Sequence, residues 1–152
     1  MTAVQRGATA DASYTSGTDR EETGMPADDA VHLTMPALTR HLRLARLTAA
    51  GLAGDLGFDL EAIEDLRVAV DELCAAVIDE VPADSRLTLS YRTDGDTVRI
   101  DGEVDAGGPV PELHRVAEEL LGIVADEFSV DGDDGRRWFR LVKRGQRLDG
   151  GG

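Results

Sequence analysis

Cysteine is almost absent from this chain of 152 residues, since Cys74 is the only one. A single cysteine excludes an internal disulfide and fits a reducing compartment. No apolar run approaches the roughly 20 residues that a membrane-spanning helix needs. The N-terminus also lacks the basic stretch followed by an apolar one that marks a secretory signal. These absences predict a cytoplasmic protein with no membrane partner.

Positive charge and histidine are scarce as well. The chain has 16 Lys and Arg against 30 Asp and Glu, and its net charge is −14. Because nucleic acid repels so acidic a domain, we expect no direct contact with DNA or RNA. The acidity suits a basic protein partner; alternatively, it only keeps the protein soluble. His32, His41 and His114 lack metal-ligand spacing, so we expect no metal site.

The length is sufficient for one domain with a single core. Residues 1–29 carry few large apolar side chains, and a disordered tail is predicted there. The folded domain is predicted over residues 30–144. Residues 145–152 are predicted to form a flexible C-terminal tail.

Helical spacing of apolar residues predicts three helices. The first covers residues 37–56, and the second begins after Asp59, a favourable N-cap residue. The third covers residues 111–125 and begins at Pro111 or Glu112. The apolar side of this third helix is predicted to consist of Leu113, Val116, Leu120 and Ile123.

Alternation of polar and apolar residues predicts five strands. They cover residues 31–35, 86–91, 97–104, 127–130 and 137–142. Asp94-Gly95, between the second and third strands, is a strong hairpin signal. The resulting order is strand, helix, helix, strand, strand, helix, strand, strand. It favours an α+β fold, a two-layer sandwich with helices on one face of a mixed, mostly antiparallel sheet.

Residues 65–74 read Asp-Leu-Arg-Val-Ala-Val-Asp-Glu-Leu-Cys and resemble the first ATP-site motif of anti-sigma factor kinases. Residues 32–38 and 44–48 are similar to the same family, and the likeness extends from Val31 to about Arg144. These kinases share the histidine-kinase-like (GHKL) ATPase fold. The resemblance implies an anti-sigma factor that sequesters an alternative sigma factor until an anti-anti-sigma partner releases it. It also implies a homodimer.

The resemblance assigns the ATP-site positions, and several of them have lost their chemistry. Glu72 matches the general base of the kinases. The magnesium-binding asparagine four residues later is replaced by Ala76, whose methyl group cannot ligate a hard cation. The Asp-x-Gly-x-Gly motif keeps Asp105 and Gly107, but Pro109 replaces its last glycine. Glu72 is thus interpreted as a vestigial base, and Asp105 and Gly107 as a vestigial ATP site.

The phosphate-binding lid of the kinases has no good counterpart here. The matching residues 118–124 contain one glycine and two carboxylates, which would repel phosphate. Only residues 105–110 separate the preceding strand from the third helix, whereas the kinases have a longer lid segment there. We therefore expect no cofactor, with weak or absent binding of ATP and magnesium. The simpler interpretations stay open: Glu72 as a solvated helix residue and Asp105 as a turn residue.

Arginines reverse the sign of the charge locally. Arg40, Arg43 and Arg46 fall on one flank of the first helix at a spacing of three. The resemblance implies that Arg46 contacts both the sigma factor and the antagonist; the alternative is a solvated arginine face. We expect Arg46 to point outward, with Leu44 and Leu47 buried against the sheet. A second basic run is interpreted as solubilising an edge strand; it comprises Arg136, Arg137, Arg140, Lys143, Arg144 and Arg147.

Two other functions compete with the sequestering anti-sigma factor. One is an active serine kinase that phosphorylates the anti-anti-sigma factor, which would make the protein an enzyme. The other is a nucleotide-independent adaptor unrelated to sigma factors, because a fold does not fix a function. Release by competition is favoured over redox control, since Cys74 is expected to be buried with no neighbouring basic residue to activate its thiol.

Overall fold

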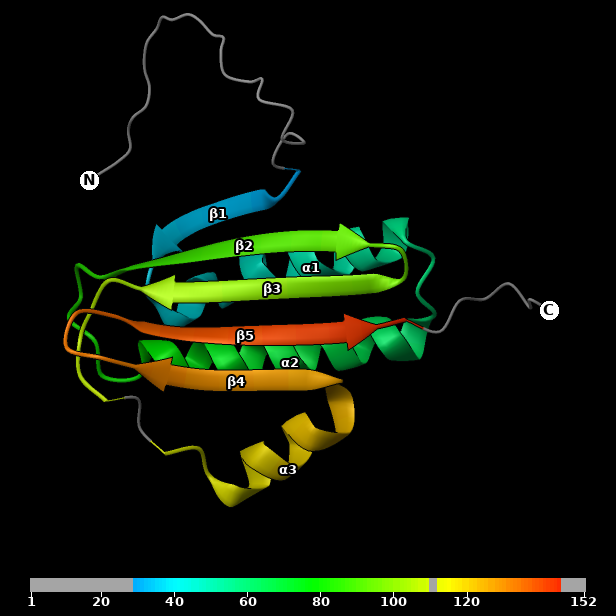
Figure 1. Cartoon of the computed structure of the whole chain (residues 1–152). Coiled ribbons are helices and arrows are strands. Elements are labelled where there is room, and N and C mark those ends of the chain that lie inside the picture. The colour runs from blue at the N-terminus through cyan, green and yellow to red at the C-terminus, as the bar shows by residue number, and fades with distance from the viewer. Residues whose placement is uncertain (1–28, 110–111, 146–152) are drawn as a thin grey trace, which may run out of the picture.

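The computed structural model describes residues 29–109 and 112–145 (Figure 1). The predicted N-terminal tail, apart from Asp29, lies outside the described residues. So does the predicted C-terminal tail beyond Gly145.

The described chain forms five strands, three α-helices and one short 3₁₀ helix in the predicted order. They are β1 (Val31–Pro36), η2 (Thr39–His41), α1 (Leu42–Asp55), α2 (Leu60–Ile78), β2 (Arg86–Asp94), β3 (Thr97–Val104), α3 (Arg115–Val124), β4 (Glu127–Gly132) and β5 (Arg137–Arg144). The strands form one sheet in the order β1-β2-β3-β5-β4. The predicted α+β fold is confirmed, and all four strand pairings are antiparallel.

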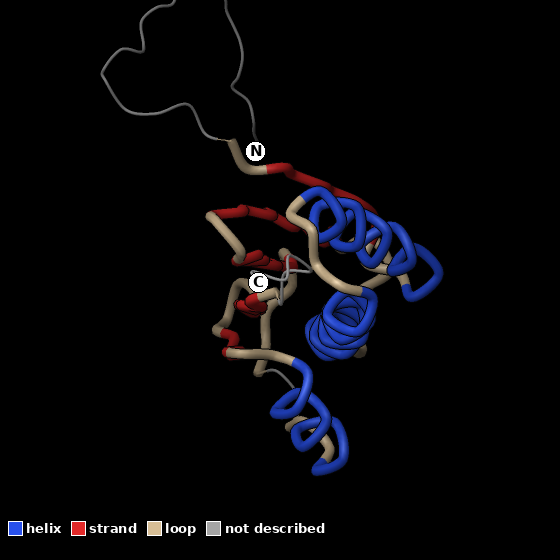
Figure 2. Tube along the Cα trace, turned by 90° about the vertical axis from the view of Figure 1, so that its right-hand side faces the viewer, coloured by secondary structure: helices blue, strands red, loops and turns tan. Residues whose placement is uncertain are grey.

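The helices are not distributed evenly around the sheet. Helices α1 and α2 lie side by side over one face, whereas α3 lies beyond α2 on the side of β4 (Figure 2). No described helix covers the opposite face of the sheet. The molecule therefore presents an open sheet face and a helical face with very different chemistry.

The core lies between the sheet and the pair α1 and α2. Alternate residues of the strands and one side of each helix point into it. Leu66 and Leu73 of α2 and Leu89 and Ile100 of the sheet have no solvent exposure. The fully buried side chain of Tyr91 links the layers, because its hydroxyl donates to the Ala45 carbonyl of α1 at 3.0 Å.

The first two helices begin as local chemistry requires, with one correction. Asp59 is confirmed as the N-cap of α2, since its carboxylate accepts from the Ala62 amide at 2.8 Å. The helix predicted from Ala37 starts later, through the turn η2. The Ala37 amide donates to the Ser85 carbonyl at 2.9 Å, and Leu38 is extended, so this segment continues away from β1 before it coils.

The third helix differs from its prediction in both its start and its face. It begins at Arg115 instead of Pro111 or Glu112; Pro111 lies outside the described residues, and Glu112 precedes the helix. His114 is extended at the N-cap, which delays the helix. The apolar side of α3 is also rotated from the predicted one: Leu121 and Val124 are buried, whereas Val116 and Ile123 are exposed.

The predicted basic run does not form one solubilising patch, because alternate residues of β5 face opposite sides. Arg137 is only 7% exposed, and its guanidinium donates to the carbonyls of Val77 at 3.3 Å and Asp79 at 2.6 Å. These carbonyls belong to the last turn and C-cap of α2, so Arg137 caps that helix. Lys143 also faces α2 and lies 3.5 Å from the Asp65 carboxylate. Arg147 lies outside the described residues.

Candidate functional site

Glu72 and Ala76, one turn apart on α2, contribute to the wall of a pocket between α2 and α3. The pocket holds about 210 Å³. Its described lining residues are Glu72, Ala75, Ala76, Asp79, Glu112, Leu113, His114 and Ala117. Pockets for small molecules usually hold about 300–1,000 Å³, so this one is small.

The lining of this pocket does not suit a magnesium nucleotide. Three of its side chains are carboxylates, from Glu72, Asp79 and Glu112, and it contains no Lys or Arg among the described residues. Carboxylates repel a triphosphate, and the methyl group of Ala76 offers no oxygen to magnesium. The donor set therefore does not fit the cofactor that the resemblance implies.

Asp105 lies at the end of β3 and is occupied by backbone contacts. Its carboxylate accepts from the Arg86 amide at 2.8 Å, and its own amide donates to the Arg86 carbonyl at 3.3 Å. These bonds close the open end of the β2–β3 ladder. Asp105 does not line the pocket that contains Glu72.

Gly107 is a point of close approach between two loops. A Cβ at this position would collide with the Asp134 carbonyl in the turn between β4 and β5. The neighbouring Gly108 amide donates to the Asp133 carbonyl at 2.9 Å and holds the two loops together. The structure thus brings Glu72 together with Ala76, but not with Asp105 and Gly107.

The three arginines predicted to bind a partner occupy different settings. Arg40 lies in η2 and Arg43 in α1, and both are exposed. Arg46 is half-buried, and its guanidinium donates to the Asp71 carboxylate of α2 at 2.5 Å. The guanidinium of Arg46 therefore points towards α2, whereas it was predicted to point outward.

Two residues near this flank were missed from the sequence. Leu47 is 55% exposed, which corrects the prediction that it is buried. Leu44, also predicted to be buried, is only half-buried, because α1 packs through Ala45 and Ala49 on another face. The signal for Leu47 was present, since it follows Arg43 by four residues and shares its flank. Asp71 had no signal, because 25 positions separate it from Arg46 and only the packing of α1 on α2 pairs them.

No model of a protein family matches the chain. Among curated proteins, the serine-protein kinase RsbW of Halalkalibacterium halodurans is 37% identical over 127 residues, which is 70% of this chain and 78% of that protein. This chain belongs to the RsbW family. A second member, the serine-protein kinase RsbW of Bacillus subtilis, is 26% identical over 120 residues, 68% of this chain and 75% of its own.

A solved structure agrees with the RsbW fold. The crystal structure of the RsbU and RsbW domains of a Mycobacterium tuberculosis protein matches with a TM-score of 0.63 at 17% identity. The match covers 79% of this chain and 33% of that larger chain. At this identity the likeness concerns the fold alone, and it confirms the predicted GHKL-like architecture.

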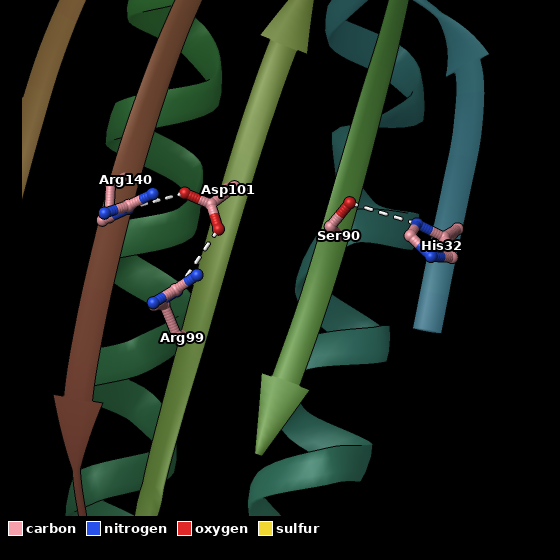
Figure 3. Close-up of polar contacts among 5 residues, drawn as sticks. All are labelled: His32, Ser90, Arg99, Asp101 and Arg140. Carbon is pink, nitrogen blue, oxygen red and sulfur yellow. Dashed lines mark hydrogen bonds and ion pairs between the residues drawn. The ribbon is translucent and has the colours of Figure 1, made fainter. Parts of the chain in front are cut away.

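In the present chain, the sheet face that no described helix covers is polar, and its side chains make contacts between neighbouring strands (Figure 3). Asp101 of β3 accepts from Arg140 of β5 at 2.8 Å and lies 3.4 Å from Arg99. The hydrogen bond to Asp101 raises the pKa of Arg140. On β1, the His32 ring nitrogen lies 3.1 Å from the Ser90 hydroxyl oxygen. Cross-strand pairs of this kind stabilise a sheet face that is exposed to solvent.

The single cysteine is confirmed as a core residue. Cys74 has no solvent exposure on α2. Burial, and next the Asp71 carboxylate, raise the pKa of its thiol. The Arg46 guanidinium lowers the pKa, which corrects the prediction that Cys74 has no basic neighbour. The thiol therefore stays protonated at neutral pH and lacks the thiolate character of a redox sensor.

In the described part of the chain, no helix is long and apolar enough to cross a bilayer. No cluster of three or more His, Cys, Asp or Glu side chains within residues 29–109 and 112–145 is arranged to hold a metal ion.

Proposed function

We propose that this RsbW-family chain is an anti-sigma factor that sequesters a sigma factor by stoichiometric binding. An anti-anti-sigma protein releases the sigma factor by competing for the same surface, and neither step needs ATP. The observation that carries this proposal is the pocket beside Glu72. It is small and acidic, and it has Ala76 where the kinases hold magnesium.

The partner surface in this proposal is the flank of η2 and α1 that contains Arg40, Arg43, Arg46 and Leu47. Three arginines share this flank with an exposed leucine, and arginine is enriched at protein interfaces and among their central contacts. The contact between Arg46 and Asp71 holds the guanidinium in one place before a partner arrives. Less side-chain freedom is then lost when a partner carboxylate binds.

The charge of the whole chain supports a basic partner. Sigma factors bind DNA and carry basic surfaces, while this chain has a net charge of −14. Opposite net charges raise the rate of association over a distance, whereas the arginine flank makes its direct contacts with carboxylates of that partner.

The test is a binding titration without nucleotide. Each sigma factor of the source organism is titrated against the full chain by calorimetry, and unphosphorylated anti-anti-sigma proteins are then added to the complex. We expect one sigma factor to bind at a fixed stoichiometry and one antagonist to displace it. If no sigma factor binds in the absence of ATP, the proposal fails.

A second function, a serine kinase acting on the anti-anti-sigma protein, has its own support. Glu72 is retained in the pocket wall, and the relatives at 37% and 26% identity are named serine-protein kinases. The chain is incubated with labelled ATP, magnesium and the candidate antagonist. Phosphoserine that disappears in the Glu72→Ala variant would establish the kinase and overturn the nucleotide-independent mechanism.

A further inference from the structure

Two cations at the start of the arginine flank have no counter-ion in the described structure. Arg40 and Arg43 are exposed, and neither makes an ion pair with a described residue. Helices η2 and α1 contain no carboxylate before Asp55, the last residue of α1. The carboxylate of Asp71 reaches this flank from α2, but Arg46 already holds it. The flank is therefore locally positive, although the whole chain has a net charge of −14.

The flank continues towards the end of α1 as a single row. Arg43, Leu47, Gly51 and Gly54 follow one another at spacings of four, four and three residues, which places them along one line of the helix. All four are exposed. The row is about 16 Å long at the rise of an α-helix. We call these four residues the α1 row.

The domain itself does not need the two glycines of the α1 row. Gly51 and Gly54 have ordinary helical backbone, since the described glycines with positive φ are Gly57, Gly95 and Gly108. A Cβ at Gly51 or Gly54 would meet no other part of the described domain within 4 Å. Alanine would therefore fit at both positions, and it is the better helix former.

An uncovered helix face that lacks side chains permits close approach from outside. Glycine is the residue that allows another backbone or a bulky group to come near. Beside the glycines, Leu47 offers apolar surface that is 55% exposed. The α1 row thus combines unpaired positive charge, an exposed leucine and bare backbone, in that order along the helix.

The charge of the flank decides between the possible occupants. Arg40 and Arg43 require a partner with carboxylates. A second copy of the chain would bring an identical row, whose side chains are those of arginine and leucine, so the arginines would gain no carboxylate. An anionic membrane or a nucleic acid is repelled by the net charge of −14.

We propose that the α1 row docks a helix of the sigma factor that carries carboxylates at one end and apolar side chains on the following turns. The carboxylates meet Arg40 and Arg43, an apolar side chain packs on Leu47, and the helix then lies close to the bare backbone of α1. A straight row of this length matches about three turns of another helix, and small residues at the contact shorten the distance between two helix axes. This inference rests on the proposed anti-sigma function and extends its surface to Gly51 and Gly54.

The test is the variant with Gly51→Ala and Gly54→Ala. We expect it to melt several degrees higher, because alanine favours the helix. We also expect it to bind the sigma factor about tenfold more weakly, because two methyl groups hold the partner helix away. A variant that gains stability while it loses affinity has not misfolded. Thermal melts and calorimetry on the full chain measure the two effects, with the sigma factor that binds in the titration described above.

Gly122→Ala is the matched control. Gly122 is also an open helical position, but it belongs to α3, which lies on the other side of α2 from α1 (Figure 2). We expect this variant to melt higher as well, with a change in affinity below about twofold. Equal affinity of the double alanine variant and the original chain would overturn the inference while the anti-sigma function stands. If no sigma factor binds the original chain, the proposed function fails and the inference fails with it.

Amide hydrogen exchange on the complex tests the nature of the occupant. We expect the original chain to protect a helical segment of the sigma factor that has carboxylates at one end and apolar residues at spacings of three and four. Protection of a segment without carboxylates, or of a strand, would overturn the choice of occupant. So would self-association in sedimentation that the double alanine variant abolishes, because a second copy would then cover the row.

Discussion

The guanidinium of Arg46 bridges α1 and α2 before any partner binds. It donates to Asp71 at 2.5 Å, yet both side chains remain partly exposed, at 30% and 45%. A guanidinium has five N–H donors, and one carboxylate uses at most two of them. Arg46 can therefore keep its bond to Asp71 and still donate to a carboxylate of a partner. This makes it an oriented contact residue that also ties the two helices.

Substitution of Arg46 tests this dual role. We expect Arg46→Ala to weaken sigma binding by about 2 kcal/mol or more, as central interface arginines do. The free energy of unfolding should fall by less than about 1 kcal/mol, because a partly exposed ion pair contributes little. Calorimetry and thermal melts measure the two effects, with Arg92→Ala on the open sheet face as control. Equal and small losses of affinity in both variants would remove Arg46 from the interface.

Gly107 is required for the close packing of two loops, and its substitution tests that contact. Any side chain there collides with the Asp134 carbonyl, so Gly107→Ala should force the two loops apart and lower stability by about 1–3 kcal/mol. Gly122→Ala is the control, because that position in α3 is open and alanine favours a helix by about 1 kcal/mol. Urea unfolding compares the variants. A Gly107→Ala protein as stable as the original would show that the loops do not need this contact.

At the scale of elements, prediction from the sequence succeeded where the signal is local. Asp59 caps α2 through a bond to a residue three positions away, and the Asp94-Gly95 hairpin joins strands that are adjacent in the chain. The third helix was misplaced because its face depends on what α2 offers it. The burial of Val124 and the exposure of Ile123 follow from docking, which periodicity alone cannot reveal.

The candidate site divides in the same way. Glu72 and Ala76 could be assigned together because one helical turn places them on the same wall. The separation of Asp105 and Gly107 from that wall depends on the path of the loop after β3. The pairing of Arg46 with Asp71 depends on how α1 and α2 are aligned. Neither is a property of a short segment of sequence.

Arg137 gives the prediction for the junction of α2 and β5. Its guanidinium holds the carbonyls of Val77 and Asp79, which Arg137→Met would leave without this partner. We expect a loss of about 2–4 kcal/mol in the free energy of unfolding, because buried acceptors would lose a charged donor. Arg136→Met, at the exposed neighbouring position, should change stability by less than about 0.5 kcal/mol. Urea titration decides, and similar midpoints for the two variants would contradict the capping role.

At the scale of the whole molecule, the charges are sorted by face. The open sheet face carries arginines that are paired with Asp101 and Glu103 across strands. The surface formed by α2 and α3 is acidic around the pocket, where Glu72, Asp79 and Glu112 lie. Nucleotide would have to enter on this acidic side, so the same distribution that favours a basic protein partner disfavours ATP.

The acidic pocket predicts how the melting temperature of the protein responds to ATP. A ligand that binds only the folded state stabilises it by RT ln(1 + [L]/Kd), so about 1 mM ATP with a Kd of about 10 μM would add about 2.7 kcal/mol. For a domain of this size that gain would raise the Tm by several degrees. We expect a shift below about 1 °C with ATP and magnesium, because the pocket offers carboxylates and the methyl group of Ala76. Ala76→Asn should not restore a shift, since it supplies one magnesium ligand and leaves Glu72, Asp79 and Glu112 around the phosphates. A rise of several degrees in the unmodified protein would show that the pocket accepts nucleotide despite its charge.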